Sequence, residues 1–422
     1  MAETKNAQVT AARLASGWAG ESAPNRSRPG RRSRLGRVAM TVALMLPLAT
    51  QTPRADQTSG AEWTPAKSEE TDVLVTRFLA RVDAQNANLP RACLALAIGS
   101  DRGRFLAKGF GECAPGSRAT EHTVFHVGSL AKQFTAAAVL DLMHRHAKLR
   151  TGTPVALDLP LAQIFNGVDH WPGREEDGEG VQPVTIRSLL TMTSNLPNFT
   201  RQPPSSVDPH GRIGAPQLLA EVKKMKPWGW PNTFEYSNTS YFLLSEIVEE
   251  VVAPGEAAPR SHHDYLRAEI FRRADLHETG FVGDYGPNAR VAQPIHRRPP
   301  VFDQPDWLKG SADVASSASD LFNWNGALMS GRVIPAEAWR LMVSDGARVT
   351  PSIYYGMGWF VEHRPAHDVY FHSGLVPGFT SHNIIAAAKA GPSWTSVTLL
   401  LNTDGVDGLE QLAEELLRLA SD

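Results

Sequence analysis

Residues 129–146 read SLAKQFTAAAVLDLMHRH and form the most strongly helical stretch of the chain. The stretch is rich in Ala and Leu and apolar on most sides, so we predict a buried helix that starts near Ser129 and ends near His146. Ser129 and Lys132 stand at positions i and i+3, which face the same way on a helix. This helix, with a Ser-x-x-Lys pair in its first turn, is the element from which the rest of the sequence is interpreted.

Strands are predicted at both ends of the chain and helices between them. The predicted strands lie at 92–98, 104–109, 369–373, 380–387 and 396–402. One helix is predicted to start at Asp72, and further helices are predicted at 185–192, 215–225, 240–252, 318–329 and 406–419. Loops are predicted at 162–183 and 200–214. We therefore expect an α+β fold in which one antiparallel sheet, built from both chain ends and flanked by helices, carries an inserted, mainly helical domain.

The expected domain limits follow from this pattern. Residues 1–57 form an N-terminal region and 58–71 a polar linker, before a single folded unit at 72–422. Within that unit, the α/β part covers 72–120 and 346–422, and the helical part covers 121–345. A cleft between two such parts is a usual place for a small-molecule site.

The composition is that of a globular protein: 422 residues, of which 42% are hydrophobic and 20% charged. Lys and Arg total 42 against 44 Asp and Glu, and without a basic excess we expect no nucleic-acid partner. We expect a small-molecule or peptide substrate, while the oligomeric state stays open.

The N-terminal region has the build of a secretory signal. A basic block at 26–37 precedes the uncharged apolar run Val38–Ala49, which is shorter than a membrane-spanning helix. We expect export to the periplasm or the medium, with the signal-like segment near 31–49. Ala49 and Ala55 are both small enough to mark cleavage, a disordered tail is the alternative, and transient membrane contact of this segment stays open.

The two cysteines, Cys93 and Cys113, are too few for a disulfide scaffold. On adjacent strands of one hairpin, their register is about three residues away from direct opposition. The strand rise turns this offset into roughly 10 Å, beyond bridging range. This geometry disfavours a disulfide, although export of the chain would allow the two cysteines to pair, so the pairing stays open.

The pair Ser129 and Lys132 is suited to nucleophilic catalysis. A serine becomes a good nucleophile when a base takes its proton, and a lysine serves as that base if desolvation keeps it neutral. A helix N-terminus also points free N–H groups at the position where negative charge develops. A capping serine beside an unrelated lysine is the alternative, because about one Ser-x-x-Lys occurs by chance in a chain of this length.

Two further motifs stand at element boundaries. Tyr236-Ser237-Asn238 precedes the helix at 240–252, and a tyrosine and an amide there suit proton relay and contact with a lysine or a carbonyl. His372-Ser373-Gly374 ends the strand at 369–373, where glycine permits close approach of a substrate backbone. Each motif alone also has a purely structural explanation: the tyrosine motif as a turn and helix cap, and the histidine motif as a packed histidine. The occurrence of all three motifs in this order by chance is much rarer than that of any one of them.

These three motifs, in this order, resemble the serine β-lactamase and penicillin-binding-protein superfamily in its class C-like branch of β-lactamase, D-peptidase and esterase relatives. The resemblance covers about residues 70–420. Further similar stretches are VFHVG at 124–128, TIRSLLTMTSNL at 185–196, FEYSNTSYFLL at 234–244, YGMGW at 355–359 and FHSGLVPGF at 371–379. The implied fold is that of the β-lactamases and transpeptidases.

The resemblance also implies roles. Ser129 would be the acylated nucleophile, and Lys132 and Tyr236 would share general-base work. Asn238, His372, Ser373 and Gly374 would bind substrate, and the backbone N–H groups of Ser129 and Leu375 would form the oxyanion hole. The implied activity is that of a serine hydrolase forming an acyl-enzyme on ester, amide or β-lactam bonds; the alternative is a catalytically silent sensor or cell-wall-binding protein.

The sequence differs from the family pattern at positions that we expect to affect substrate preference more than the catalytic steps. Asn195 and Asn232 stand where glycine is usual, and His372 replaces a lysine. Because imidazole is mostly neutral near pH 7, we expect weak anchoring of a substrate carboxylate that improves toward pH 6, and a preference for esters.

Other hydrolase classes are disfavoured by the sequence. There is no Gly-x-Ser-x-Gly elbow of the α/β-hydrolases. The dense cluster His262-His263-Asp264 has no second partner motif and is expected in a solvated loop, so we expect neither a metal site nor a cofactor.

Overall fold

The computed structural model describes residues 63–168, 171, 183–208, 210–227, 233–286, 290–297 and 305–422. The signal-like segment near 31–49 and Asn232 lie outside the described residues.

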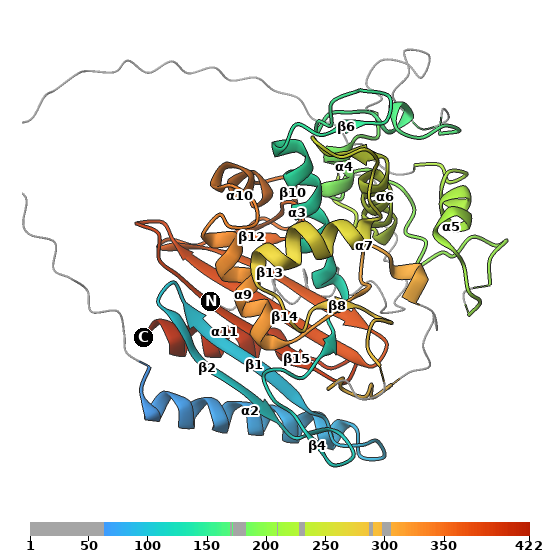
Figure 1. Cartoon of the computed structure of the whole chain (residues 1–422). Coiled ribbons are helices and arrows are strands. Elements are labelled where there is room, and N and C mark those ends of the chain that lie inside the picture. Colours follow the sequence, from blue (N-terminus) through green and yellow to red (C-terminus); the bar gives the residue numbers. More distant parts are fainter. Residues whose placement is uncertain are drawn as a thin grey trace, which may run out of the picture.

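One antiparallel sheet forms the centre of the fold, in the order β10-β11-β12-β13-β14-β15-β1-β2 (Figure 1). Its strands come from both ends of the chain, as predicted, and β1 pairs directly with β15. The strands are β1 (Leu94–Ser100), β2 (Gly103–Phe110), β10 (Ala347–Arg348), β11 (Ile353–Tyr355), β12 (Phe360–His363), β13 (His367–Val376), β14 (Phe379–Ala388) and β15 (Trp394–Leu401).

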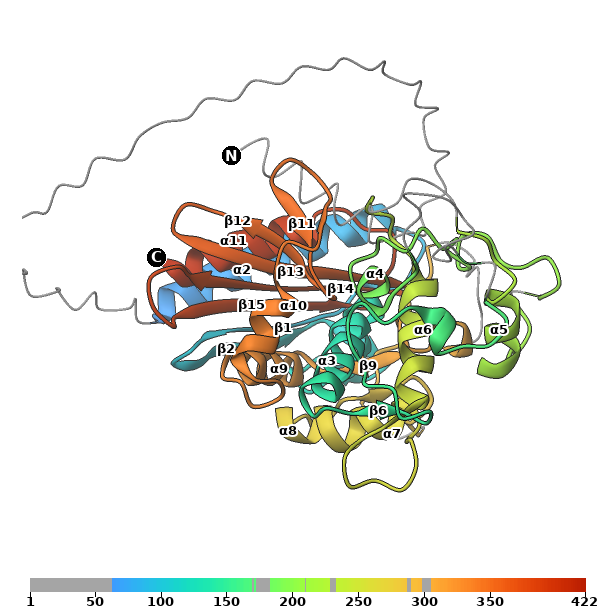
Figure 2. The same ribbon diagram turned by 90° about the horizontal axis from the view of Figure 1, so that it is seen from above.

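Helices cover both faces of this sheet (Figure 2). On one face α11 (Leu409–Ser421) packs on β14 and β15 and against α2 (Pro65–Gln85). Its apolar stripe is buried there as the sequence periodicity predicts, with Leu409, Leu412, Leu416 and Leu417 inward. On the other face α9 (Ala318–Met329) packs on β1 and β15. The α+β class is therefore confirmed.

The inserted part is mainly helical and surrounds α3 (Ala131–His144), which follows a 3₁₀ turn, η1 (Gly128–Leu130). Because α6, η4 and α10 all pack against α3, that helix is buried on nearly every side. The other elements of the insert are α4 (Ile186–Leu190), α5 (Ala215–Val222), α6 (Asn238–Glu249), α7 (His262–Tyr265), η4 (Leu266–Phe271), α8 (Arg272–Ala274), α10 (Ala336–Met342) and a small sheet of β5 (Phe125–His126), β9 (Val314–Ser316) and β8 (Gly280–Phe281).

The shorter remaining elements are β3 (Glu112–Ala114), β4 (Ser117–Arg118), β6 (Lys148–Leu149), β7 (Val251–Val252), η2 (Leu161–Gln163) and η5 (Pro305–Leu308). Among the described helices, none is both long and apolar enough to cross a bilayer.

Two local predictions near the N-terminus are wrong. The polar stretch up to residue 71 does not remain a linker, because α2 begins at Pro65. Thr64 caps this helix by accepting a hydrogen bond from the Lys67 N–H, and a proline at the first helical position needs no N–H partner. The first turns of this helix were missed because their composition is polar, although the helix has a buried face that includes Thr71 and Val75.

The two cysteines do pair, contrary to the expectation from register. Cys93 and Cys113 form a disulfide with their Cα atoms 5.2 Å apart. Cys113 lies on β3 rather than on β2, and Gly111, with φ of +78°, turns the chain back over Cys93 between those strands. A side chain at Gly111 would have its Cβ only 2.8 Å from the Ala92 carbonyl oxygen. The offset calculated for a straight hairpin therefore does not apply.

Candidate active site

The nucleophile candidate sits where η1 meets the backbone of β13. Gly128 has φ of +55°, and a Cβ there would lie 2.8 Å from the Leu375 nitrogen. Gly374 faces the Val127 carbonyl so closely that a Cβ at Gly374 would overlap it. The two glycines therefore let the turn carrying Ser129 rest on β13, with the Leu375 nitrogen beside it.

Lys132 is completely buried as the second residue of α3 and makes three hydrogen bonds. Its Nζ lies 2.7 Å from Asn238 Oδ1, 2.8 Å from the Ser311 carbonyl oxygen and 3.1 Å from Ser129 Oγ. The first two partners are pure acceptors, whereas a serine hydroxyl both donates and accepts. A neutral amine has two hydrogens, so both are used on these acceptors and its lone pair is left for the Ser129 hydroxyl.

The electrostatic setting favours that neutral amine. Burial lowers the pKa of Lys132 well below its usual value, and the negative charge of Asp313 opposes the shift without reversing it. The nearest rings are Tyr236 and Tyr241, whose centroids lie 4.8 and 5.6 Å from Nζ. Lys132 therefore has the position that a general base needs, and its pKa is shifted in the direction that favours the neutral, proton-accepting amine.

Tyr236 immediately precedes α6 and is buried beside Lys132 and His372. Its hydroxyl makes no hydrogen bond of good geometry within the described part of the chain. Burial raises the pKa of Tyr236, and the Ser129 side chain is the polar neighbour that most opposes the rise. Tyr236 is therefore a neutral phenol at neutral pH, a proton donor or relay in the resting protein.

Asn238 is held in one orientation by a chain of side chains that the sequence motifs did not reveal. Its Nδ2 donates to Thr200 Oγ1 at 2.9 Å, and Thr200 Oγ1 donates to Asn198 Oδ1 at 2.9 Å. Asn198 Oδ1 also accepts from the backbone N–H of Asn238 at 3.3 Å. Because the amide nitrogen is fixed on Thr200, its oxygen must face Lys132. Only the polar Pro-Asn-Phe-Thr run at 197–200, after the similar stretch 185–196, could have indicated these residues.

His372 lies on β13, fully buried, with its ring centroid 6.1 Å from that of Tyr236. Its Nδ1–H donates to the Ser373 carbonyl oxygen at 2.7 Å, and the Tyr355 hydroxyl lies 3.4 Å from Nε2. Burial is the largest cause that lowers the pKa of His372 to about 3, and Lys132 acts in the same direction whenever its amine is protonated. The neutral imidazole agrees with the sequence expectation, but a titration between pH 7 and 6 does not, because this ring stays neutral until far lower pH.

The side chain of Ser373 points away from the other motif residues. Strand alternation places it on the face covered by α11, where its hydroxyl contacts His382 Nδ1 at 2.9 Å and Glu410 Oε1 at 3.3 Å. Ser129, Lys132, Tyr236, Asn238 and His372 are thus brought together, Gly374 and Leu375 contribute backbone, and the Ser373 side chain is not part of the cluster.

His126, the other histidine of a His-x-Gly triplet, borders a cavity of about 310 Å³. Tyr285 and the segment 291–294 also line it. The His126 ring packs 4.6 Å from the Phe379 ring, and burial lowers its pKa to about 4. A hollow therefore begins three residues before Ser129 on the same segment of chain.

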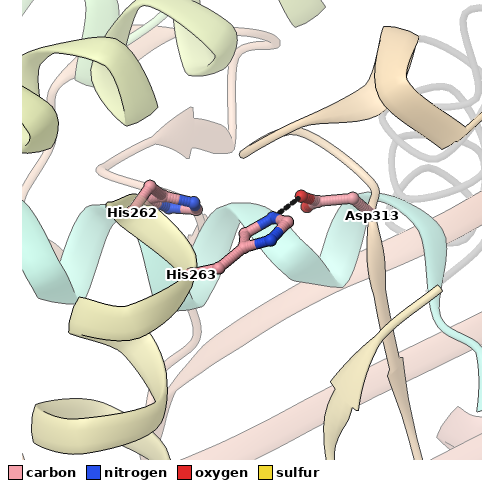
Figure 3. A group of neighbouring side chains, drawn as sticks. All are labelled: His262, His263 and Asp313. Carbon is pink, nitrogen blue, oxygen red and sulfur yellow. Dashed lines mark hydrogen bonds and ion pairs between the residues drawn. The ribbon is translucent and has the colours of Figure 1, made fainter. Parts of the chain in front are cut away.

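The histidine pair at 262–263 lies in helix α7 and not in a solvated loop (Figure 3). Its acidic partner is Asp313, on a distant loop, rather than Asp264, whose backbone N–H and carboxylate both bond the capping residue Ser261. One nitrogen or oxygen from each of His262, His263 and Asp313 lies within 4.8 Å of the others. This is the one such group of three found among the described residues.

A family model described as Beta-lactamase matches residues 78–421. The chain belongs to this family. PbpX of Bacillus subtilis (strain 168), named as a penicillin-binding protein, is 27% identical over 302 residues, which cover 70% of this chain and 66% of PbpX. Protein flp of Staphylococcus aureus (strain MRSA252) is 23% identical over 316 residues, covering 71% of this chain and 57% of flp. The matched part is less than two thirds of the length of these relatives.

Solved structures of the β-lactamase family and its neighbours share the fold. An octameric penicillin-binding protein homologue from Pyrococcus abyssi superposes with a TM-score of 0.64 at 20% identity, covering 83% of this chain and 77% of that one. A D-amino acid amidase from Ochrobactrum anthropi SV3, complexed with D-phenylalanine, gives a TM-score of 0.59 at 19% identity and covers 82% of this chain and 98% of the amidase. The chain is thus a member of the β-lactamase family that shares its fold with a penicillin-binding protein homologue and with a D-amino acid amidase.

Proposed function

We propose that this protein hydrolyses ester, amide or β-lactam bonds through an acyl-enzyme formed on Ser129. The observation that carries the proposal is the set of contacts made by Lys132. Its two pure acceptors, Asn238 Oδ1 and the Ser311 carbonyl, orient a buried amine so that its lone pair faces Ser129 Oγ. Burying a lysine beside a serine hydroxyl costs desolvation energy, which no opposite charge in contact with it among the described residues offsets, so a purely structural role does not explain this placement.

The proposed acylation step moves one proton and exchanges one bond. As Ser129 Oγ attacks the substrate carbonyl carbon, its proton passes to Lys132 Nζ and an Oγ–C bond forms. The carbonyl oxygen becomes negative, and the N–H groups of Ser129 and Leu375 stabilise it. When the carbonyl reforms, the bond to the leaving group breaks and the acyl group stays on Ser129.

Tyr236 is proposed as the proton donor to the leaving group. Its raised pKa keeps the phenol protonated, so it gives its proton to the departing amine or alkoxide and is reprotonated from Lys132. This division of labour refines the shared general-base role expected from the resemblance, because the two pKa shifts run in opposite senses. Water then attacks the acyl carbon of the acyl-enzyme and gives one proton to Lys132, the bond between that carbon and Ser129 Oγ breaks, and Lys132 returns the proton to Oγ as the acid product leaves.

The proposed substrates are acyl compounds without a carboxylate next to the scissile bond, esters above all. Family members that hold a lysine at this position can pair it with a substrate carboxylate, whereas a neutral, buried His372 offers no charge. The D-amino acid amidases and penicillin-binding proteins among the neighbours make amides and D-alanyl peptides the next candidates.

A substrate panel tests this function. The full-length protein is incubated with nitrophenyl esters of increasing acyl length, a chromogenic cephalosporin and D-alanyl peptides. We expect turnover of the esters that exceeds turnover of the cephalosporin. Faster cephalosporin than ester hydrolysis would contradict the assigned substrate preference. No turnover together with no covalent labelling of Ser129 would favour the silent sensor or cell-wall binder.

Export is the proposed location, supported by the signal-like segment and by the disulfide. A disulfide between Cys93 and Cys113 persists in the periplasm or outside the cell, whereas the cytosol keeps thiols reduced. Sequencing the N-terminus of the mature protein tests the proposal. We expect it to begin after Ala49, and a soluble cytoplasmic protein that keeps residues 31–48 would contradict it.

A further inference from the structure

The loop Gly310–Asp313 is bound by two side chains of α3, one on each of its first two carbonyls. Lys132 Nζ donates to the Ser311 carbonyl oxygen at 2.8 Å, and Thr135 Oγ1 donates to the Gly310 carbonyl oxygen at 2.8 Å. The orientation of the Lys132 amine therefore depends on how this loop is held. None of these loop residues belongs to the motifs that the sequence singled out.

Asp313 closes this loop from behind. One of its carboxylate oxygens accepts a hydrogen bond from the Gly310 N–H at 3.1 Å, and the other lies 2.7 Å from His263 Nε2 (Figure 3). The His263 ring is in turn stacked on Phe281 with centroids 3.5 Å apart, which fixes it on Asp313. Asp313 is buried, while the His263 side chain remains 35% exposed. A series of contacts therefore runs from the partly exposed His263 through Asp313 to the loop whose Ser311 carbonyl binds Lys132.

The carboxylate is charged. Burial alone would raise the pKa of Asp313, but the hydrogen bond and charge of His263 and the hydrogen bond from the Gly310 N–H together lower it. Asp313 is also the one charge found to raise the pKa of Lys132 against the effect of burial. The other groups facing Lys132 are uncharged: the phenols of Tyr236 and Tyr241 and the imidazole of His372.

Lys309 is a further charged residue near this loop, and its charge is paired with two glutamates. Lys309, next to Gly310, pairs with Glu246 at 2.6 Å and with Glu249 at 2.7 Å. His262 is neutral, because burial lowers its pKa to about 3. The negative charge near Lys132 therefore comes from Asp313 with its partner His263.

We propose that Asp313, anchored by His263, is a positioning residue for the general base: it fixes the Gly310–Ser311 turn that orients Lys132 and sets how readily the amine becomes protonated. The proposal rests on the proposed function of Lys132. It explains why a carboxylate and an imidazole are packed behind a catalytic lysine without touching the substrate side. The negative charge of Asp313, which raises the pKa of Lys132 against the effect of burial, keeps the buried amine from being too weak a base to take the Ser129 proton.

A metal ion held by His262, His263 and Asp313 is the competing interpretation. Two observations weigh against it. His263 and Asp313 already satisfy each other at 2.7 Å, and His262 Nε2 is occupied by Thr135 Oγ1 at 3.1 Å. An ion held by His263 Nε2 and Asp313 would have to break their contact, whereas His262 Nδ1 has no hydrogen-bond partner within the described residues, so metal occupancy becomes an outcome of the test.

The test measures Lys132 directly, so that it does not depend on catalysis. Lysine is labelled with ¹³C, the Lys132 signal is assigned by its loss in Lys132→Met, and its titration is followed by NMR. Asp313→Asn keeps the size and the acceptor for the Gly310 N–H but removes the charge. We expect the midpoint for Lys132 to fall by about one pH unit. Asp320→Asn removes another buried carboxylate, which accepts from Thr279 at 2.7 Å, and should leave the midpoint unchanged.

A second variant keeps the proposal testable if Asp313→Asn does not fold. His263→Gln retains the charge on Asp313, so the Lys132 midpoint should not move to lower pH. An unchanged midpoint in folded Asp313→Asn, or a downward shift in His263→Gln, would overturn the proposal. So would one equivalent of divalent metal in the purified wild type that is lost in His263→Gln.

The acid limb of Ser129 acylation separates this inference from the proposed function. If Asp313→Asn shifts both the Lys132 titration midpoint and the acid limb of acylation to lower pH, the inference and the proposed function both stand. If the midpoint falls but no variant, including the wild type, is acylated, the effect of Asp313 on Lys132 stands and the proposed function fails.

Discussion

The hydroxyl of Thr200 offers the sharpest test of how Lys132 is oriented. It accepts from Asn238 Nδ2 and donates to Asn198 Oδ1, both at 2.9 Å, and it is buried. Thr200→Val keeps the shape of the side chain but removes both hydrogen bonds. Asn238 Nδ2 is left buried without this acceptor, at a cost of about 1–3 kcal/mol in the free energy of unfolding. Asn198 Oδ1 keeps its backbone donors, so we expect no further loss there.

The effect on rate comes from the freed amide. Once Nδ2 has no fixed acceptor, the Asn238 amide is no longer held with its oxygen toward Lys132. A base that loses its orientation for part of the time should acylate roughly 10- to 100-fold more slowly, less than the 10²–10⁴ expected for removing the base itself. Pre-steady-state acylation by a nitrophenyl ester measures the rate, and thermal unfolding measures stability.

Thr239→Val is the matched control. Thr239 is also buried in this region, donates to the Pro197 carbonyl and accepts from the Phe199 N–H, but does not contact the Asn238 side chain. We expect a similar loss of stability with a much smaller loss of rate, and recovery of the rate in Thr200→Ser. Equal rate losses in Thr200→Val and Thr239→Val, or an unchanged rate in Thr200→Val, would refute the orienting role of the network.

Three further outcomes are expected. Replacing Cys93 and Cys113 by alanine should lower the free energy of unfolding by about 3 kcal/mol, the entropy of closing a loop with a sequence separation of 20; calorimetry showing no change would contradict it. His372→Lys should shift the ratio of cephalosporin to ester hydrolysis toward the cephalosporin, since it adds a cation that the neutral imidazole lacks; an unchanged ratio would leave His372 a purely structural residue. Lys132→Met and Tyr236→Phe should each slow acylation by roughly 10²–10⁴-fold, and the double variant by less than the product, because the two act as one proton relay; strictly multiplicative losses would mean separate roles.

Much of the architecture was predictable because it depends on periodicity. The amphipathic α11 shows a period of 3.6 residues, and the helix at 318–329 was predicted to the residue. The motif residues were predictable because spacing on one helix brings Ser129 and Lys132 together whatever the rest of the chain does.

What the sequence did not reveal depends on contacts between distant segments. The disulfide requires the turn at Gly111, which changes the register that a straight hairpin would have. Asp313 and His263 are fifty residues apart, and Asn198 and Asn238 are forty, so no local pattern connects either pair. The depth of burial of His372, which sets its pKa, is likewise a property of the packed sheet and not of the triplet His-Ser-Gly.

The central claim is that Ser129 carries the acyl group. Its most direct test is mass spectrometry of the intact protein, quenched within the first turnover of a nitrophenyl ester and then digested. We expect an adduct of one acyl mass on the peptide containing Ser129, absent from Ser129→Ala and retained in Ser393→Ala, which changes an exposed serine. An adduct on any other residue, or ester hydrolysis that persists in folded Ser129→Ala, would contradict the account.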